Sequence, residues 1–189
     1  MAEHNNHRDA TKNVHAGTNH IGDSVNTPIF LSSTYKLTEE RYAGWAAGAQ
    51  HTLLYSRLSS VNSDAVAQKI CAMEGGEDAE TFSSGMAAIS TTMLMLLNQG
   101  DHIVASADVY GGTYGLMTEV LPRLGIETTM ADIRDPSSYE AAIQDNTKIM
   151  YIETITNPNL KVCDIPAMVE VAKRHNLLVV VDNTFASPW

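Results

Sequence analysis

The feature that most constrains the fold is an alternation of short apolar runs and amphipathic stretches, which begins near residue 78. The apolar runs predict strands at 79–82, 102–106, 127–131, 149–153 and 177–181. The amphipathic stretches predict helices at 86–97, 113–124, 137–144 and 165–175. Because strand and helix alternate strictly, the chain is expected to form an α/β fold, a mainly parallel sheet with helices on both faces. Pro122 should kink or shorten the second helix.

The first fifty residues differ from the rest, being polar and interrupted by glycine and proline. We therefore expect residues 1–50 to form an N-terminal arm and residues 51–189 to form the first part of a domain. Within these stretches, helices are predicted at 38–47 and 63–73, the second with Asn62 or Ser63 as its cap. Four histidines fall in the arm, namely His4, His7, His15 and His20. No carboxylate or thiol is spaced to complete a metal site with them, so a mobile, solvated segment and no metal are expected.

Charge and composition exclude several classes of function. Acidic residues outnumber basic ones by 22 to 12, and no basic run could follow a phosphate backbone, so nucleic acid is not an expected partner. The longest strongly apolar stretch, 93–97, is too short for a bilayer span, and the N-terminus lacks a secretory signal. Cys71 and Cys163 have no ligand spacing and are interpreted as buried thiols. We expect a soluble, cytoplasmic protein without a membrane partner.

The residues that follow the predicted strands carry the candidate chemistry. In parallel α/β sheets, ligands bind outside the carboxyl ends of the strands. Gly85 begins a helix after the first strand, where free N–H groups could hold a phosphate. Tyr110, Asn157 and Asp182 follow the second, fourth and fifth strands. Taken singly, these residues have ordinary explanations as a helix cap, a packing tyrosine and a turn cap. Together they favour a pyridoxal phosphate site, since an aspartate paired with a pyridinium nitrogen is the usual arrangement for that cofactor.

Several segments in order resemble the Cys/Met-metabolism family of pyridoxal-phosphate enzymes, which includes cystathionine γ-synthase, cystathionine γ-lyase, methionine γ-lyase and homoserine-ester sulfhydrylases. The segments are YSR (55–57), MEGGEDAETFSSGMAAIS (73–90), GDHIVASADVYGGTY (100–114), ETITNPN (153–159) and VDNTFASP (181–188). The similarity begins at HAGT (15–18) and is collinear to the last residue. It implies the large domain of a fold-type I pyridoxal-phosphate transferase, incomplete in this chain.

The resemblance also implies roles for individual residues. Gly85 and Met86 would offer backbone N–H groups to the cofactor phosphate, and Tyr110 would stack on the cofactor ring and serve as the catalytic acid or base for the leaving group. The resemblance further places Asn157 near the ring hydroxyl, Asp182 at the ring nitrogen, and Thr184 close by. In the family, the tyrosine and arginine of YSR reach the phosphate of a neighbouring subunit. Tyr55 and Arg57 would therefore complete a partner's site, which requires a homo-oligomer, at least a dimer and expected to be a homotetramer.

The chain departs from the family pattern in three places. Ser60-Val61-Asn62 replaces the usual Asn-Pro-Thr after YSR, and Gly112 stands where methionine γ-lyases commonly have cysteine. The lysine that binds the cofactor covalently in the family follows the VDNTF segment, beyond Trp189. We therefore expect an N-terminal part of a longer enzyme, without that lysine and the C-terminal domain, and inactive by itself.

The expected function is that of a pyridoxal-phosphate carbon–sulfur lyase or γ-replacement enzyme of cysteine and methionine metabolism (trans-sulfuration), acting on cystathionine or O-acyl-homoserine. Methionine γ-lyase and cystathionine β-lyase are alternatives, as is a non-catalytic N-terminal fragment that only assembles with the missing half. A nucleotide-binding domain predicts GxGxxG after the first strand, where this chain has Ser-Ser-Gly-Met-Ala-Ala.

Overall fold

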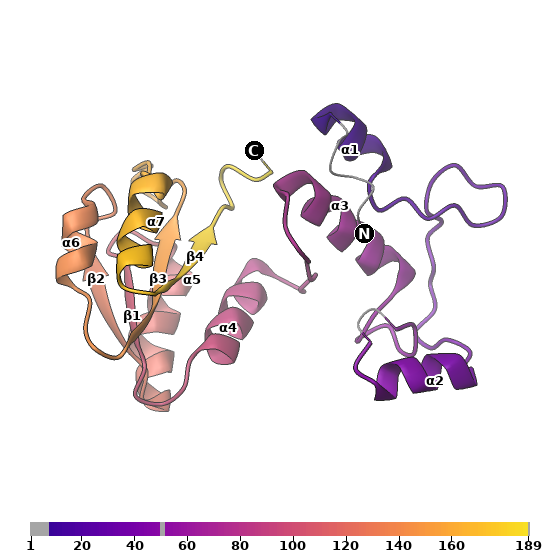
Figure 1. The fold of residues 1–189 in the computed structure, drawn as a ribbon, viewed down its shortest axis with the longest axis horizontal. Coiled ribbons are helices and arrows are strands. Elements are labelled where there is room, and N and C mark those ends of the chain that lie inside the picture. The colour runs from indigo at the N-terminus through magenta and orange to yellow at the C-terminus, as the bar shows by residue number, and fades with distance from the viewer. Residues whose placement is uncertain (1–7, 50–51, 189) are drawn as a thin grey trace. The chain divides into compact units, whose positions relative to one another are not determined.

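The structure, a computed structural model, describes residues 8–49 and 52–188. It divides into two compact units, the first ending at Thr81 and the second spanning Phe82–Ser187. Figure 1 shows the second unit as a sheet covered by helices and the first as helices joined by extended chain.

The second unit contains a four-stranded sheet in which every neighbouring pair is parallel. Its strands, in the spatial order β2-β1-β3-β4, are β1 (His102–Ser106), β2 (Glu127–Ala131), β3 (Thr147–Glu153) and β4 (Leu178–Asp182). The parallel α/β architecture predicted from the alternation is confirmed. β1 and β2 have the predicted bounds, β3 begins two residues earlier, and β4 lies one residue later.

Helices pack on both faces of this sheet, as predicted. They are α4 (Gly85–Leu96), α5 (Gly111–Gly115), the π-helix η1 (Leu116–Val120), the 3₁₀-helix η2 (Leu121–Leu124), α6 (Pro136–Ala141) and α7 (Ile165–Arg174). Along β1, Ile103 and Ala105 join a cluster with α4 and η1, whereas Val104 joins a cluster with α6 and α7. Successive side chains of a strand point to opposite faces, so a strand covered on both sides is apolar throughout.

Two predictions for this unit need correction. Residues 79–82 form no strand, and most of this stretch is exposed. A strand requires a neighbour to accept and donate its backbone hydrogen bonds, and the described sheet offers none to these residues. The single helix predicted at 113–124 is instead α5, η1 and η2 in succession. Pro122 lies in the first turn of η2, where its missing N–H is tolerated, so the helix tightens there.

The first unit is built from three helices, α1 (Asp9–His15), α2 (Glu39–Ala46) and α3 (Val61–Glu74). α2 and α3 match the predictions to within two residues. α1 was not expected, because its residues were interpreted as a mobile segment. Among the described residues of this unit, only Ala16, Ser59 and Ala67 are buried.

The cap of α3 differs from the one predicted. Ser60 is the N-cap, and its Oγ accepts from the N–H of Ser63, whose own Oγ accepts from the N–H of Ser60. This capping box satisfies two donors that the helix leaves unpaired. Asn62, the other predicted cap, instead accepts from the N–H of Phe30 and donates to the carbonyl of Pro28. Its side chain therefore ties an extended segment to the start of α3.

Within the described residues, no helix is long and apolar enough to cross a bilayer.

Candidate functional site

A cavity of about 330 Å³ lies at the carboxyl edge of the sheet in the second unit. Parallel strands end at one edge, so the loops that follow β1, β3 and β4 meet there, beside the first turn of α4. The six predicted residues of this unit all line the cavity, namely Gly85, Met86, Tyr110, Asn157, Asp182 and Thr184. Glu153 and Phe185 line it as well: the sequence placed the carboxylate of Glu153 at this edge without giving it a role, and Phe185 was not singled out.

The start of α4 provides an anion seat on one wall. Ser84 is the N-cap, and its Oγ accepts from the N–H of Ala87 at 3.0 Å. The N–H groups of Gly85 and Met86 precede the first intrahelical bond and belong to the positive end of the helix dipole. A Cβ added at Gly85 would meet no atom within 4 Å, so a ligand has room to approach its backbone.

Asp182, the last residue of β4, presents a carboxylate that three donors orient. Its Oδ1 accepts from the N–H of Thr184 at 3.1 Å and from the Thr184 hydroxyl at 2.5 Å. Its Oδ2 accepts from the hydroxyl of Tyr151 at 3.1 Å. Burial is the main cause that raises the pKa of Tyr151, which therefore stays protonated as a donor. Sequence reasoning missed Tyr151, although its place two residues before the end of a predicted strand puts it near this edge.

Tyr110 lies where β1 leads into α5, and 48% of its surface is exposed. Its N–H donates to Oε1 of Glu153 at 2.8 Å. The ring lies against Gly112, where an added Cβ would be 2.6 Å from Cε1 of Tyr110 and 3.0 Å from Sδ of Met86. Glycine at position 112 is thus what allows the ring to lie in this position.

Asn157 follows β3, and its peptide bond to Pro158 is cis. The N–H of Asn157 donates to Oε2 of Glu153 at 3.1 Å. Glu153 is the last residue of β3 and only 3% exposed. Burial raises the pKa of this carboxyl, while the two N–H donors favour its charged form and the nearby Asp182 disfavours it.

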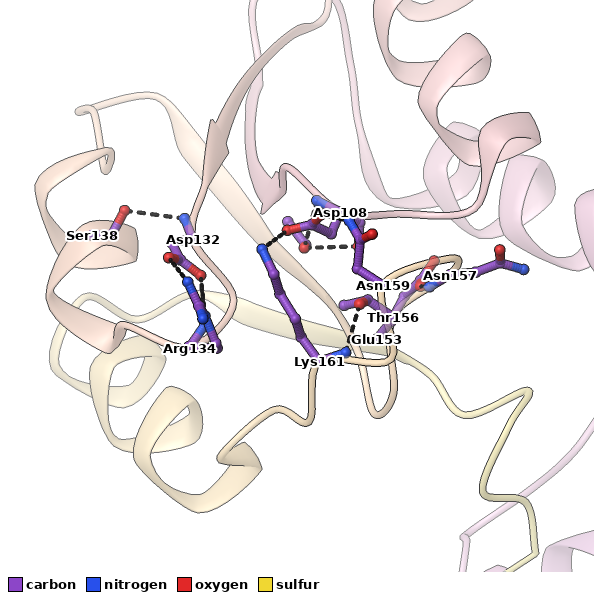
Figure 2. Close-up of polar contacts among 10 residues, drawn as sticks. Asp108, Asp132, Arg134, Ser138, Glu153, Thr156, Asn157, Asn159 and Lys161 are labelled. Atoms are coloured by element: carbon purple, nitrogen blue, oxygen red, sulfur yellow. Dashed lines mark hydrogen bonds and ion pairs between the residues drawn. The ribbon is translucent and has the colours of Figure 1, made fainter.

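A second set of contacts joins the loops after β1 and β3, as Figure 2 shows. Lys161 Nζ lies 2.5 Å from Oδ2 of Asp108, and the Asn159 amide donates to Oδ1 of the same carboxylate. These hydrogen bonds hold the pKa of Asp108 below its ordinary value. The N–H of Lys161 also donates to the hydroxyl of Thr156 at 3.0 Å, which fixes the turn between them.

Tyr55 and Arg57 belong to the first unit, so the cavity described here does not include them. The Arg57 guanidinium lies 5.0 Å above the ring of Tyr55, a cation–π contact. Their predicted role at the site of a partner subunit stays a prediction.

His4 and His7 lie outside the described residues. In the part of the chain that the structure describes, His, Cys, Asp and Glu side chains form no group of three or more that could hold a metal.

Comparisons with known proteins agree with this geometry. Residues 10–189 match the model of the family described as Cys/Met metabolism PLP-dependent enzyme. Cystathionine gamma-lyase of Bacillus subtilis is 46% identical over 166 residues, which cover 88% of this chain and 42% of that protein. L-methionine gamma-lyase of Porphyromonas gingivalis is 40% identical, with 95% and 46% covered.

Solved structures are similar as well. A putative O-acetylhomoserine (thiol)-lyase of Campylobacter jejuni, solved with N'-pyridoxyl-lysine-5'-monophosphate, superposes with a TM-score of 0.88 at 32% identity, covering 94% of this chain and 44% of that one. The chain thus spans less than half the length of each of these proteins.

Proposed function

We propose, because this chain belongs to the family of Cys/Met metabolism PLP-dependent enzymes, that the protein binds pyridoxal phosphate in the cavity of its second unit. We further propose that it cleaves or replaces a substituent on a sulfur or homoserine-ester amino acid. One observation supports this most: an anion seat, a half-exposed tyrosine ring and an oriented carboxylate line the same cavity.

The residues present fit this cofactor. A flat ring that carries a phosphate and a basic nitrogen needs an anion seat, a stacking surface and a carboxylate partner. The N–H groups of Gly85 and Met86 would hold the phosphate, the ring of Tyr110 would stack, and Asp182 would pair with the nitrogen. Asn157 would contact the ring hydroxyl, and Thr184 would support Asp182. Bound pyridoxal phosphate supplies an electron sink for a carbanion at the substrate α carbon.

The chain's own residues would then act by orientation and proton placement. The carboxylate of Asp182, held by Tyr151 and Thr184, would keep a proton on the ring nitrogen of the bound cofactor. The hydroxyl of Tyr110 would move a proton to or from the leaving group at the edge of the cavity.

The decisive experiment replaces the carboxylate. In the full-length enzyme, we expect Asp182→Ala to lower turnover by about 10²-fold or more, in line with the loss of a single preorganised electrostatic contact. The matched control is Glu170→Gln on α7, an exposed carboxylate whose partner is Lys173. Steady-state kinetics and the visible absorption of bound cofactor should both change in Asp182→Ala and remain unchanged in the control. Near-normal turnover in Asp182→Ala would contradict the proposal.

For the substrate, we propose cystathionine or an O-acyl-homoserine rather than methionine. Gly112 supports this choice, because a cysteine there would press on the ring of Tyr110 and place a thiol beside the leaving group. The alternatives are methionine γ-lyase and cystathionine β-lyase. Values of kcat/KM for the three substrates, with and without a thiol acceptor, distinguish them. A preference for methionine of more than about tenfold, about 1.4 kcal/mol, would overturn this choice but not the cofactor assignment.

For the assembly, we propose a homo-oligomer with shared sites. Residues 1–50 would form an arm at the interface, and Tyr55 and Arg57 would reach the cofactor phosphate of a neighbouring copy. A guanidinium matches phosphate oxygens in geometry and charge, which suits Arg57 for that role.

A further inference from the structure

Glu153 contacts the backbone of two separate loops with two different oxygens. Oε1 accepts from the N–H of Tyr110 at 2.8 Å, and Oε2 accepts from the N–H of Asn157 at 3.1 Å. Tyr110 follows β1, whereas Asn157 follows β3, and 43 residues separate Glu153 from Tyr110 in the chain. One carboxylate at the end of a central strand therefore links the backbones of the two loops beside the cavity.

We propose that Glu153 is a positioning residue for the cofactor site, which holds the backbone of Tyr110 and Asn157 so that the ring and the amide face the cavity. This inference rests on the proposed function, because the two loops matter only if their side chains contact the cofactor. Glu153 acts through these neighbours.

The chemistry of the contact requires a charged carboxylate of this length. A glutamate anion offers an acceptor to each N–H group, and charge-assisted hydrogen bonds are the stronger kind. In glutamine, one of the two positions becomes an NH₂ group that faces an N–H donor. Aspartate keeps the charge but is one methylene shorter, so it cannot reach both loops from the same backbone position.

Among the described residues, no cation is a cause of the pKa shift of Glu153. The titratable groups that face it are Asp182 on β4, Tyr151 on β3 and Tyr139 on α6. Burial and Asp182 raise the pKa of Glu153, whereas the two backbone donors lower it. Protonation places a hydrogen on an oxygen that now accepts one, so the amides of Tyr110 and Asn157 should both sense the titration.

Loss of this contact should leave the fold intact, because another link joins the same loops. Lys161 and Asn159, from the loop after β3, both bond Asp108, from the loop after β1 (Figure 2). Glu153→Gln also preserves the volume of the buried side chain. The variant therefore tests position rather than folding, and circular dichroism and thermal unfolding will verify that it folds.

The first test follows amide chemical shifts in the ¹⁵N-labelled protein as pH is lowered. We expect the amide protons of Tyr110 and Asn157 to titrate with one shared midpoint above the ordinary glutamate range. That transition should vanish in Glu153→Gln and persist in Glu170→Gln. This transition reports the two hydrogen bonds themselves, and the cofactor-binding test that follows reports their role in positioning the site. Separate midpoints, or a transition that survives in Glu153→Gln, would overturn the inference.

The second test measures binding of pyridoxal phosphate by calorimetry to the wild-type, Glu153→Gln and Glu170→Gln forms of the full-length enzyme. We expect Glu153→Gln to bind about tenfold more weakly, the effect of one lost hydrogen bond to a charged group, and Glu170→Gln to bind as the wild type does. If the wild type binds pyridoxal phosphate and Glu153→Gln binds it equally tightly, this inference fails and the proposed function stands. A wild type that does not bind pyridoxal phosphate would overturn the proposed function itself.

Discussion

His102 is a buried histidine at the amino end of β1, the edge of the sheet opposite the cavity. Its Nδ1 lies 2.8 Å from the hydroxyl of Thr147 on β3, and its Nε2 lies 2.9 Å from the hydroxyl of Thr129 on β2. Burial lowers the pKa of His102, an effect that Glu127 partly opposes. A neutral imidazole thus links three neighbouring strands.

This lowered pKa predicts acid sensitivity. Below pH 6.5, the ordinary histidine value, the unfolded chain binds a proton that the folded chain resists. The free energy of unfolding should therefore be highest above that pH and should fall as the pH drops toward the lowered pKa of the folded state. Urea unfolding at several pH values measures this dependence. His102→Gln should reduce the loss between about pH 7 and pH 5, whereas the exposed His20→Gln should not. An equal pH dependence in wild type and His102→Gln would contradict the prediction.

At the scale of elements, the chain just after α1 passes close to α3 at a glycine. Gly17 has a φ of +69°, and a Cβ there would lie 2.2 Å from the backbone oxygen of Ala65 on α3. The chain can pass this close to the helix only because position 17 has no side chain. Sequence periodicity did not predict α1, and this contact is one tertiary reason why α1 is ordered.

We expect Gly17→Ala to detach α1 from α3. The left-handed backbone conformation alone costs an alanine about 1 kcal/mol. Gly22→Ala is the matched control, because Gly22 has a φ of +61° but no atom within 4 Å of an added Cβ. Gly17→Ala should therefore destabilise the protein by a few kcal/mol and Gly22→Ala by about 1 kcal/mol. Urea unfolding and hydrogen exchange of the α1 amides measure the difference, and equal losses in the two variants would refute the packing argument.

At the scale of the whole molecule, the shared-site proposal concerns residues that are exposed in this chain. Tyr55 and Arg57 are both exposed, and they contact one another rather than a core. An exposed arginine on an aromatic ring is suited to a phosphate brought by another copy. Under the shared-site proposal, Arg57 and Asp182 would belong to different subunits of one active site.

Mixing two impaired variants of the full-length enzyme tests this proposal. Arg57→Ala should weaken cofactor retention, and Asp182→Ala should lose turnover. After random exchange of subunits, half of the dimers are mixed and each can rebuild one intact site, so about one quarter of the sites should recover. Arg134→Ala, an exposed arginine paired with Asp132, serves as a control that retains activity alone. If mixed dimers form without any recovery of activity, the sites are not shared.

The sequence by itself determined the architecture and the edge at which the candidate site lies. Local patterns predict strands at 102–106 and 127–131 with their observed bounds, and the first of these is buried along its whole length. Parallel strands end at one edge, so Tyr110 and Asp182 could be expected together from their places after predicted strands, whereas Gly85 lines the same cavity although the strand predicted before it does not form.

Only the tertiary structure decided which groups touch. The segment at 79–82 was predicted as a strand but has no described partner, and strand formation depends on a neighbour as much as on the sequence. The contact of Tyr151 with Asp182 depends on the pairing of β3 with β4, and the bridge from Glu153 to Tyr110 depends on the packing of β1 beside β3. These contacts join residues far apart in the chain, so their geometry follows from strand order and register, which local patterns do not encode.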